Sequence, residues 1–344
     1  MSRPFRPTPS NAHTDSGCIT RVKGIELGHC SHPQRPTGCS VVIAREGATA
    51  AVDVRGAAPG TRETDLLRPG NLVEKVHAVL LAGGSAWGLA ATEGVVRWLE
   101  EQDIGLDTGY GKLPLVPAAV LFDLSVGDPR IRPGAACGYR ACAAASRNPH
   151  PLAGNIGAGT GATIGKLYGP ACAMKGGAAS ASVTLNGVTV GALVACNAVG
   201  DVVNPATGRL LAGARMAPDY LALRDSTACL LRGEAPSFTL PGANTTIGIL
   251  ATDAPLTRPQ LERLAIAGHD GLARCITPAH TLLDGDTLFA LATAQSENSL
   301  DMVTIAAMAA QATSMAVLRA VHQAKGLRFP DLWLPALADM PVNP

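Results

Sequence analysis

The chain has 344 residues, of which 47% are hydrophobic but only 3% aromatic, with 38 glycines and 25 prolines. That length allows a large core and one or two domains, and the core must be built mainly from Ala, Val, Leu and Ile. The formal net charge of +1 provides no basic surface for nucleic acid. We therefore expect closely spaced elements with many turns, and no nucleic-acid partner.

Nine cysteines, an odd number with no CxxC pair, indicate small buried thiols of a reducing compartment rather than a disulfide framework. Residues 1–18 read as a flexible tail, because they lack the apolar segment of a signal peptide. No apolar run free of glycine and charge reaches membrane-spanning length. The cluster of His29, Cys30, His32 and Cys39 matches no strong zinc spacing. These features predict a cytoplasmic protein without a membrane or metal partner.

The first third of the chain is predicted to be mostly strands. Short alternation predicts one hairpin from residues 19–22 and 25–29, and a second from 39–44 and 48–54 with its turn at 45–47. A buried strand follows at 77–82, then a helix over 89–102, and another strand at 118–124.

Two loops in this region stand out. Residues 53–67 are dense in charge, glycine and proline, which fits either a solvated loop before a helix or a loop whose Arg and Asp side chains shape a cleft. The run Gly83-Gly84-Ser85-Ala86-Trp87-Gly88 sits between strand and helix like a nucleophile elbow. It fails that motif because Trp87 stands where the last glycine belongs. Tight packing or a pocket wall is the remaining interpretation.

The glycine-rich run at 154–167 resembles a phosphate-binding loop at first sight. From Gly159 to Gly165 it has one residue too many, and Leu167 replaces the metal-binding hydroxyl. Nucleotide binding is therefore rejected. What remains is a glycine-lined backbone, including Gly161, that can approach a substrate closely and that ends in Lys166.

The second half carries clearer patterns. Asn186-Gly187 between alternating segments predicts a hairpin of residues 179–185 and 188–196. The stretch 204–240 is irregular, and a long irregular segment inside a compact domain is usually functional or disordered. Further elements are a helix over 134–147, a strand over 246–252, a helix over 261–271, a strand after Asp286 and a helix over 301–324.

Three polar features could carry chemistry. Asn197 lies at the end of a predicted buried strand. It could cap the strand, or its amide could donate to a developing oxyanion. Asp284 and Asp286 point the same way on an extended chain, and calcium would need more oxygen ligands nearby. Thr245 opens the strand over 246–252 directly after a loop. Either the loop simply closes into the strand, or the Asn244–Thr245 bond is cut and Thr245 becomes an N-terminal nucleophile whose own α-amine is the base.

Taken together, Thr245, Asn197, Lys166 and the Asp284/Asp286 pair resemble the P1-family peptidases. That family holds the DmpA-type aminopeptidases, the β-peptidyl aminopeptidases and the NylC-type 6-aminohexanoate-oligomer hydrolases. The stretches that carry the resemblance follow in order from about residue 19 to 325: 53–65, 81–89, 159–166, 243–246 and 284–287.

The resemblance implies a fold and a chain organisation. The fold is α/β (α+β), a four-layer α/β/β/α sandwich similar to Ntn-hydrolases, with the connectivity of DmpA and the ornithine acetyltransferases. A single catalytic domain, 19–330, would be cut by the protein itself into chains 1–244 and 245–344. The family also implies a homo-oligomer, a tetramer of processed protomers.

The resemblance also implies a site. Threonine after asparagine is the junction of the NylC-like branch, whereas the DmpA-type and β-peptidyl enzymes use serine after glycine. Thr245 would be the nucleophile for a small peptide or amide substrate, with no cofactor or metal. Lys166, Asn197, Asp284 and Asp286 would complete the catalytic site. Ser85, Trp87, Arg62 and Gly161 are the predicted substrate-binding residues. Two alternatives stay open, an acyltransferase of ornithine-acetyltransferase type and an uncut protein that binds a small ligand.

Overall fold

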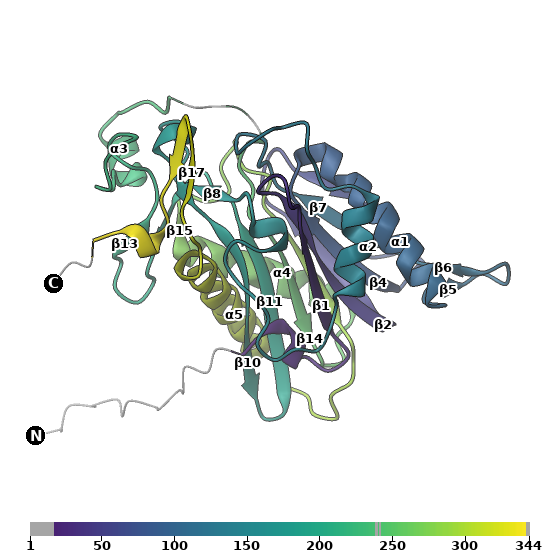
Figure 1. Cartoon of the computed structure of the whole chain (residues 1–344). Helices are drawn as coiled ribbons and strands as arrows, with labels where there is room; N and C mark the ends of the chain where they lie inside the picture. The colour runs from purple at the N-terminus through teal and green to yellow at the C-terminus, as the bar shows by residue number, and fades with distance from the viewer. Residues whose placement is uncertain (1–16, 238–239, 241, 342–344) are drawn as a thin grey trace, which may run out of the picture.

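The computed structural model describes residues 17–237, 240 and 242–341 (Figure 1). The predicted flexible tail, residues 1–18, therefore lies almost wholly outside the described residues. Its last two residues do not belong to a tail, because both are buried in the domain. Gly17 forms a β-bridge with Ser182, and the Cys18 thiol lies 3.1 Å from the Pro149 carbonyl oxygen.

Nine strands form one mixed sheet in the order β10-β11-β14-β16-β2-β4-β7-β3, with β1 also paired to β2. The β14–β16 and β4–β7 pairs are parallel and the others antiparallel. The strands are β1 Glu26–Ser31, β2 Gly38–Val54, β3 Gly60–Arg62, β4 Lys75–Ala82, β7 Ala118–Val120, β10 Gly177–Leu185, β11 Val188–Cys196, β14 Ile247–Thr252 and β16 Thr287–Ala292.

Successive side chains of these strands enter different cores, as expected for strands buried on both faces. In β4, Leu80 packs in a cluster with helices α1 (Ala91–Glu101) and α2 (Ala135–Ala143), whereas Val79 and Leu81 face the strands of the other half of the sheet. In β16, Leu288 packs against helices α4 (Arg258–Cys275) and α5 (Met302–His322), and Phe289 faces the same central cluster as Val79. Three cores therefore separate four layers, which confirms the predicted α/β/β/α architecture (Figure 1).

The long strand β2 was wrongly predicted to be a hairpin. Residues 45–47 do not turn the chain back. They interrupt the pairing with β4, whose register shifts between Ile43 and Ala48. Gly47 has a φ of +73°, which lets the strand change direction without ending. As a result the first part of β2 pairs with β1 and β4, and its last part pairs with β16.

The other hairpin predictions had opposite outcomes. The turn at Asn186-Gly187 is confirmed, and both residues have positive φ angles, 48° and 80°, as a type I′ turn requires. The predicted hairpin of residues 19–22 and 25–29 is wrong. Ile19–Arg21 is a 3-10 helix, and β1 pairs with β2 instead. Ile19 and Val22, three residues apart, both enter the core, which is helical rather than strand spacing.

The main helices cover the two outer faces of the sheet layers. They are α1 Ala91–Glu101, α2 Ala135–Ala143, α4 Arg258–Cys275 and α5 Met302–His322. By length and composition alone, helix α5 could cross a membrane, although it contains Arg319. Half of its most apolar window is buried in the protein, where α5 packs against α4, β10 and β11.

Smaller elements complete the described chain. In its described residues, the irregular segment 204–240 contains the short strand β13 (Leu210–Ala212) and the short helix α3 (Ser226–Leu231), and it leads to the Asn244–Thr245 junction. The remaining elements are η1 Ile19–Arg21, η2 Asp65–Leu67, η3 Ser85–Ala90, β5 Leu106–Asp107, β6 Lys112–Leu113, η4 Gly157–Gly159, β8 Thr163–Ile164, η5 Pro170–Cys172, β9 Met174–Lys175, β12 Asp201–Val203, β13 Leu210–Ala212, α3 Ser226–Leu231, β15 Ile276–Thr277, β17 Leu327–Phe329, β18 Leu332–Leu334 and η6 Leu337–Asp339.

Candidate active site

The Asn244–Thr245 peptide bond lies buried just before β14. Its carbonyl oxygen accepts two hydrogen bonds, one from the backbone N–H of Gly285 at 2.9 Å and one from Thr245 Oγ1 at 2.5 Å. Thr245 is only 2% exposed. A carbonyl held by a fixed N–H donor next to a hydroxyl has the parts needed for attack by that hydroxyl.

Both predicted aspartates lie at this junction, in the loop that leads into β16. Asp286 Oδ1 accepts from the Thr246 backbone N–H at 2.6 Å, so it holds the residue that follows Thr245. Asp284 Oδ2 accepts from the backbone and the hydroxyl of Thr281, at 2.9 and 2.6 Å. Burial, and then the neighbouring carboxylate of Asp286, raise the pKa of Asp284 to about 6.

The charged loop after β2 holds the aspartate loop through its backbone. The N–H groups of Arg55 and Gly56 donate to the Asp286 carbonyl at 3.0 and 3.2 Å, and that of Ala58 donates to the Asp284 carbonyl at 2.9 Å. A Cβ atom on Gly56 would lie 2.2 Å from the Asp286 nitrogen, so only glycine fits there. The start of this segment thus lies at the site, but it holds the aspartate loop through backbone N–H groups rather than through the paired Arg and Asp side chains of the cleft interpretation.

Lys166, predicted from the glycine-rich run, reaches the other side of the junction. Its Nζ donates to the carbonyls of Asn197 at 2.9 Å and of Ala243 at 3.2 Å. The Thr245 backbone N–H donates to the same Asn197 carbonyl at 3.0 Å. Burial lowers the pKa of Lys166 to about 7, against the opposing attraction of Asp284. A lysine with that pKa can exchange a proton near neutral pH.

Asn197 follows β11 directly and its side chain is fixed on both sides. Oδ1 accepts from the Thr163 backbone N–H at 2.9 Å, and Nδ2 donates to the Phe122 carbonyl at 3.2 Å. In this uncut chain the donors to the Asn244 carbonyl are therefore the Gly285 backbone N–H and the Thr245 hydroxyl rather than the Asn197 amide. Sequence analysis missed Gly285 because a backbone donor carries no signal in the residue type.

A pocket of about 240 Å³ opens beside Thr245. It is lined by Ala58, Pro59, Gly60, Ser85, Ala86, Val120, Phe122, Leu240, Gly242 and Thr245. Of the four residues predicted to bind substrate, Ser85 lies in this wall. Ser85 has a φ of 54°, an unusual angle for a non-glycine residue, at the first position of η3.

The other three predicted substrate-binding residues are not among those that line this pocket. Gly161 packs inside the protein, where a Cβ atom would lie 2.2 Å from the Pro36 carbonyl oxygen. Trp87 is 57% exposed, and its ring lies under the Arg132 guanidinium at 4.0 Å. Arg62 pairs with Glu63 at 3.6 Å. In this structure their contacts are thus backbone packing for Gly161, a cation–π contact for Trp87 and an ion pair for Arg62.

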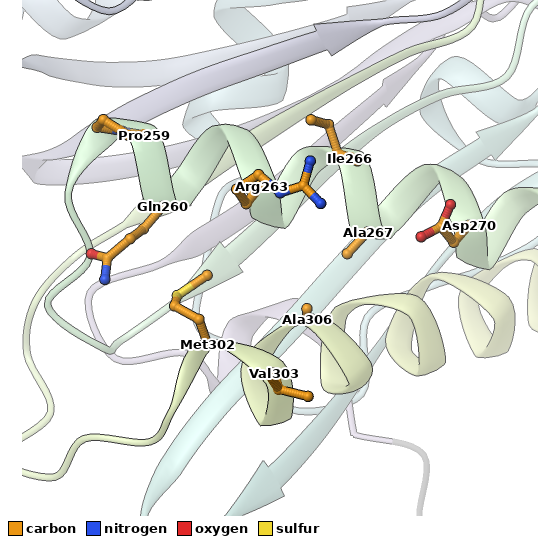
Figure 2. A pocket seen from close by; sticks show the side chains of 9 residues that line it. All are labelled: Pro259, Gln260, Arg263, Ile266, Ala267, Asp270, Met302, Val303 and Ala306. Atoms are coloured by element: carbon orange, nitrogen blue, oxygen red, sulfur yellow. The ribbon is translucent and has the colours of Figure 1, made fainter.

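A larger hollow of about 520 Å³ lies between α4 and α5 (Figure 2). Its wall includes Ile266, Met302 and Val303, with Arg263 and Asp270 on α4, and none of the predicted catalytic residues lines it. The part of the chain that the structure describes holds no group of three or more His, Cys, Asp or Glu side chains placed to bind a metal ion. The junction is therefore the candidate active site.

Two histidines beside the site were missed by sequence analysis. His280 Nδ1 lies 2.8 Å from Asp286 Oδ2, and its ring contacts that of His269 on α4 with centroids 4.8 Å apart. The two residues stand 11 positions apart in a loop and a helix, and no motif or spacing connects them. Only the folded chain brings them together.

Known proteins share the sequence and the fold. The family model described as peptidase family S58 matches residues 17–331. The chain belongs to this family. It is 49% identical over 296 residues to an uncharacterized aminopeptidase of Mycobacterium leprae (strain TN), covering 81% of this chain and 79% of the relative. It is 34% identical over 278 residues to a 6-aminohexanoate-oligomer endohydrolase of Kocuria sp. (strain KY2), covering 78% and 73%.

A solved structure confirms the fold of this S58 chain. The L-aminopeptidase D-Ala-esterase/amidase from Ochrobactrum anthropi, described as a new variant among the Ntn hydrolase fold, superposes with a TM-score of 0.67 at 22% identity. The match covers 97% of this chain and 93% of that one. Family S58 holds the DmpA-type enzymes, so the resemblance found in the motifs is confirmed. As a member, this chain is a hydrolase that acts on peptide or amide bonds.

Proposed function

We propose that this S58 hydrolase cuts its own Asn244–Thr245 bond and then uses Thr245 as an N-terminal nucleophile on amide substrates. The observation that supports this most directly is the environment of the Asn244 carbonyl. It faces the Thr245 hydroxyl and a fixed Gly285 N–H donor, with Lys166 and two carboxylates buried around it. Thr245 Oγ1 is thus next to the bond that it would attack.

In the uncut chain the Thr245 α-amine does not exist, so another group must take the hydroxyl proton. Lys166 fits this role because burial lowers its pKa to about 7 and its Nζ already contacts the Ala243 carbonyl. Oγ1 attacks the Asn244 carbonyl carbon, and the peptide nitrogen leaves as the protonated amine, giving an ester. Water then cleaves that ester to the Asn244 carboxylate and the free Thr245 hydroxyl.

In the processed enzyme the new α-amine replaces the peptide nitrogen beside the Asn197 carbonyl. It takes the Oγ1 proton as the hydroxyl attacks a substrate amide. The substrate amine leaves with a proton, and water releases the acyl group as a carboxylate. Lys166, whose charge disfavours a second cation nearby, helps keep the α-amine neutral. The Asn197 amide is a candidate donor to the substrate oxyanion after local rearrangement.

The class of substrate follows from the pocket and from the relatives. A pocket of about 240 Å³ beside Thr245, with no charged residue among its described lining, fits an uncharged acyl group of a peptide or amino-acid oligomer. The relatives' names point to the same bond type, in an aminopeptidase and in an oligomer endohydrolase. We propose a short peptide or an ω-amino-acid oligomer as substrate.

The test uses two single variants of the full chain. Thr245→Ala is expected to stay as one uncut chain and to hydrolyse no amide, whereas Thr245→Ser keeps a hydroxyl nucleophile and is expected to be cut and active. Gel mobility and release of amine from a panel of short peptides and 6-aminohexanoate oligomers are the readouts. Amide hydrolysis by purified Thr245→Ala at the wild-type rate would overturn the proposal.

A further inference from the structure

His280 stands directly behind the carboxylate that holds the nucleophile's backbone. The two oxygens of Asp286 face different partners: Oδ1 accepts from the Thr246 N–H at 2.6 Å, and Oδ2 accepts from His280 Nδ1 at 2.8 Å and from the His280 backbone at 3.3 Å. One carboxylate therefore joins the imidazole to the peptide unit that follows Thr245. Its orientation depends on both ends of this bridge.

The imidazole itself is fixed in place. The His269 ring packs edge-on against it, with an interplanar angle of 72°, and His269 Nε2 lies 3.0 Å from the Asp53 carbonyl oxygen. The second ring nitrogen of His280, Nε2, is buried and makes no hydrogen bond of normal geometry with the described residues, while the His269 backbone also favours the protonated ring. The well-formed hydrogen bond of the ring is therefore the one at Nδ1, and a carboxylate partner requires Nδ1 to donate.

We propose that His280 is a positioning residue for this reaction: it donates from Nδ1 to Asp286 and keeps the carboxylate turned toward the Thr245–Thr246 backbone. This inference rests on the proposed function, since it assumes that the Thr245 end of β14 is the nucleophile. His280 acts through Asp286. It lies behind the carboxylate, on the side away from Thr246.

The charge of His280 adds an electrostatic effect to the positional one. The titratable and charged groups around it are Asp286 in its own loop, His269 on α4, and Asp53 with Arg55 at the end of β2. Burial opposes protonation, but the hydrogen bond to Asp286 raises the pKa of His280 above its ordinary value. A protonated imidazole favours ionised carboxylates at the junction.

The backbone at this position allows the two effects to be separated. His280 has a φ of 55°, a left-handed angle that asparagine and glycine tolerate better than other residues. The Nδ2 group of an asparagine can donate from about the place of Nδ1, so His280→Asn keeps the donor and removes the titration. His280→Gly keeps the backbone and removes both. His77→Asn, at a buried imidazole on β4 that faces Leu115, is the matched control.

The experiment measures kcat, KM and the pH profile of kcat/KM on processed, folded protein, together with the rate of self-cleavage. His280→Asn is expected to keep kcat within about threefold. The acid limb of its kcat/KM pH profile is expected to move to higher pH, because a cation near the carboxylates is lost. His280→Gly is expected to lose about 10- to 100-fold in kcat with KM little changed. The control is expected to match the wild type in both.

Two results would overturn the inference. One is His280→Gly with wild-type kcat, self-cleavage and pH profile. The other is His280→Asn losing as much kcat as His280→Gly, since the retained donor would then have no effect. Both outcomes are separate from failure of the proposed function, which is decided by Thr245→Ala alone.

Discussion

Two buried lysines, Lys166 and Lys175, have nearly the same exposure and the same lowered pKa, but their amines contact different groups. Their exposed fractions are 2% and 0%, and burial lowers the pKa of each to about 7. Lys175 Nζ donates to three carbonyls, those of Gly159, Ala162 and Gly176, at 2.8–2.9 Å. An ammonium has three hydrogens, so this lysine is fully used in holding the glycine-rich run.

Lys166 has a different set of partners. Its two carbonyl acceptors include Ala243, the residue before Asn244, and the Asn197 carbonyl that it shares with the Thr245 N–H. Two acceptors use two of the hydrogens of the amine, so its remaining position, a lone pair in the neutral form and a third hydrogen in the protonated form, is left for a reacting group. A lowered pKa is therefore not sufficient to identify a catalytic lysine. What its hydrogens contact decides between a structural and a chemical role.

The largest expected effect comes from Lys166→Met. This change removes the amine but keeps a similar side-chain volume, so the fold is expected to persist while self-cleavage slows by about 10²–10³-fold. The fraction of cut chain over time, measured on a gel, checks this. Cleavage at the wild-type rate would show that Lys166 is as structural as Lys175.

The pH dependence of self-cleavage sharpens the same comparison. If neutral Lys166 takes the Thr245 proton, the rate rises about tenfold per pH unit below about 7 and levels off above it, because burial lowers the pKa of Lys166 to about 7. Purification of the uncut chain in acid, followed by pH jumps and timed gel samples, measures this. A rate that does not change between pH 5 and 8 would contradict the role.

Lys175→Met is expected to affect stability instead of chemistry. It leaves three buried carbonyls without their donor, which costs about 2–5 kcal/mol of unfolding free energy. Because its folded pKa lies below the unfolded value of 10.5, the unfolded chain binds more protons between about pH 7 and 10.5. The unfolding free energy of the wild type therefore rises with pH across that window because of Lys175. The variant is expected to lack this rise.

Chemical denaturation of Lys175→Met at pH 7 and pH 9 tests both parts of this expectation. The folded fraction is expected to self-cleave at the wild-type rate. A variant of wild-type stability that fails to self-cleave would mean that the second lysine also acts on the junction.

The smallest expected effect belongs to Trp87→Ala. Trp87 lies on the surface against Arg132 and is not among the residues that line the pocket beside Thr245. We expect kcat/KM to change by less than about threefold, since surface stacking contributes little. Ser85→Tyr is the contrasting variant. Its larger side chain would occupy part of the pocket beside Thr245, so it is expected to raise KM. A large loss in Trp87→Ala would extend the substrate site onto this surface.

Local patterns predicted the local elements of the fold. The Asn186-Gly187 turn, the strand at 247–252 and the long final helix each depend on neighbouring residues, and all are present. The continuous strand β2 was missed because its middle carries turn-like residues, while pairing with β1, β4 and β16 holds it extended. Tertiary pairing overrode the local signal at Gly47.

The same contrast between features with a local sequence pattern and features set by tertiary contacts applies to the site. Thr245, Lys166, Asn197 and the aspartates were predicted because a set of short motifs pointed to them in order. The Gly285 N–H and the His280 imidazole were not, because a backbone donor and an isolated histidine carry no spacing. Gly161 and Trp87 were predicted to bind substrate; in this structure Gly161 packs against the Pro36 backbone and Trp87 contacts Arg132.

Every catalytic role assigned to Thr245 depends on cleavage of the Asn244–Thr245 bond by the chain itself. Intact-mass spectrometry of freshly purified protein, with N-terminal sequencing of the smaller fragment, tests it most directly. We expect two chains from the wild type, the smaller beginning Thr245-Thr246-Ile247, and one uncut chain of 35.1 kDa from Thr245→Ala. A wild-type chain that stays intact for days at neutral pH, or a cut at another bond, would contradict it.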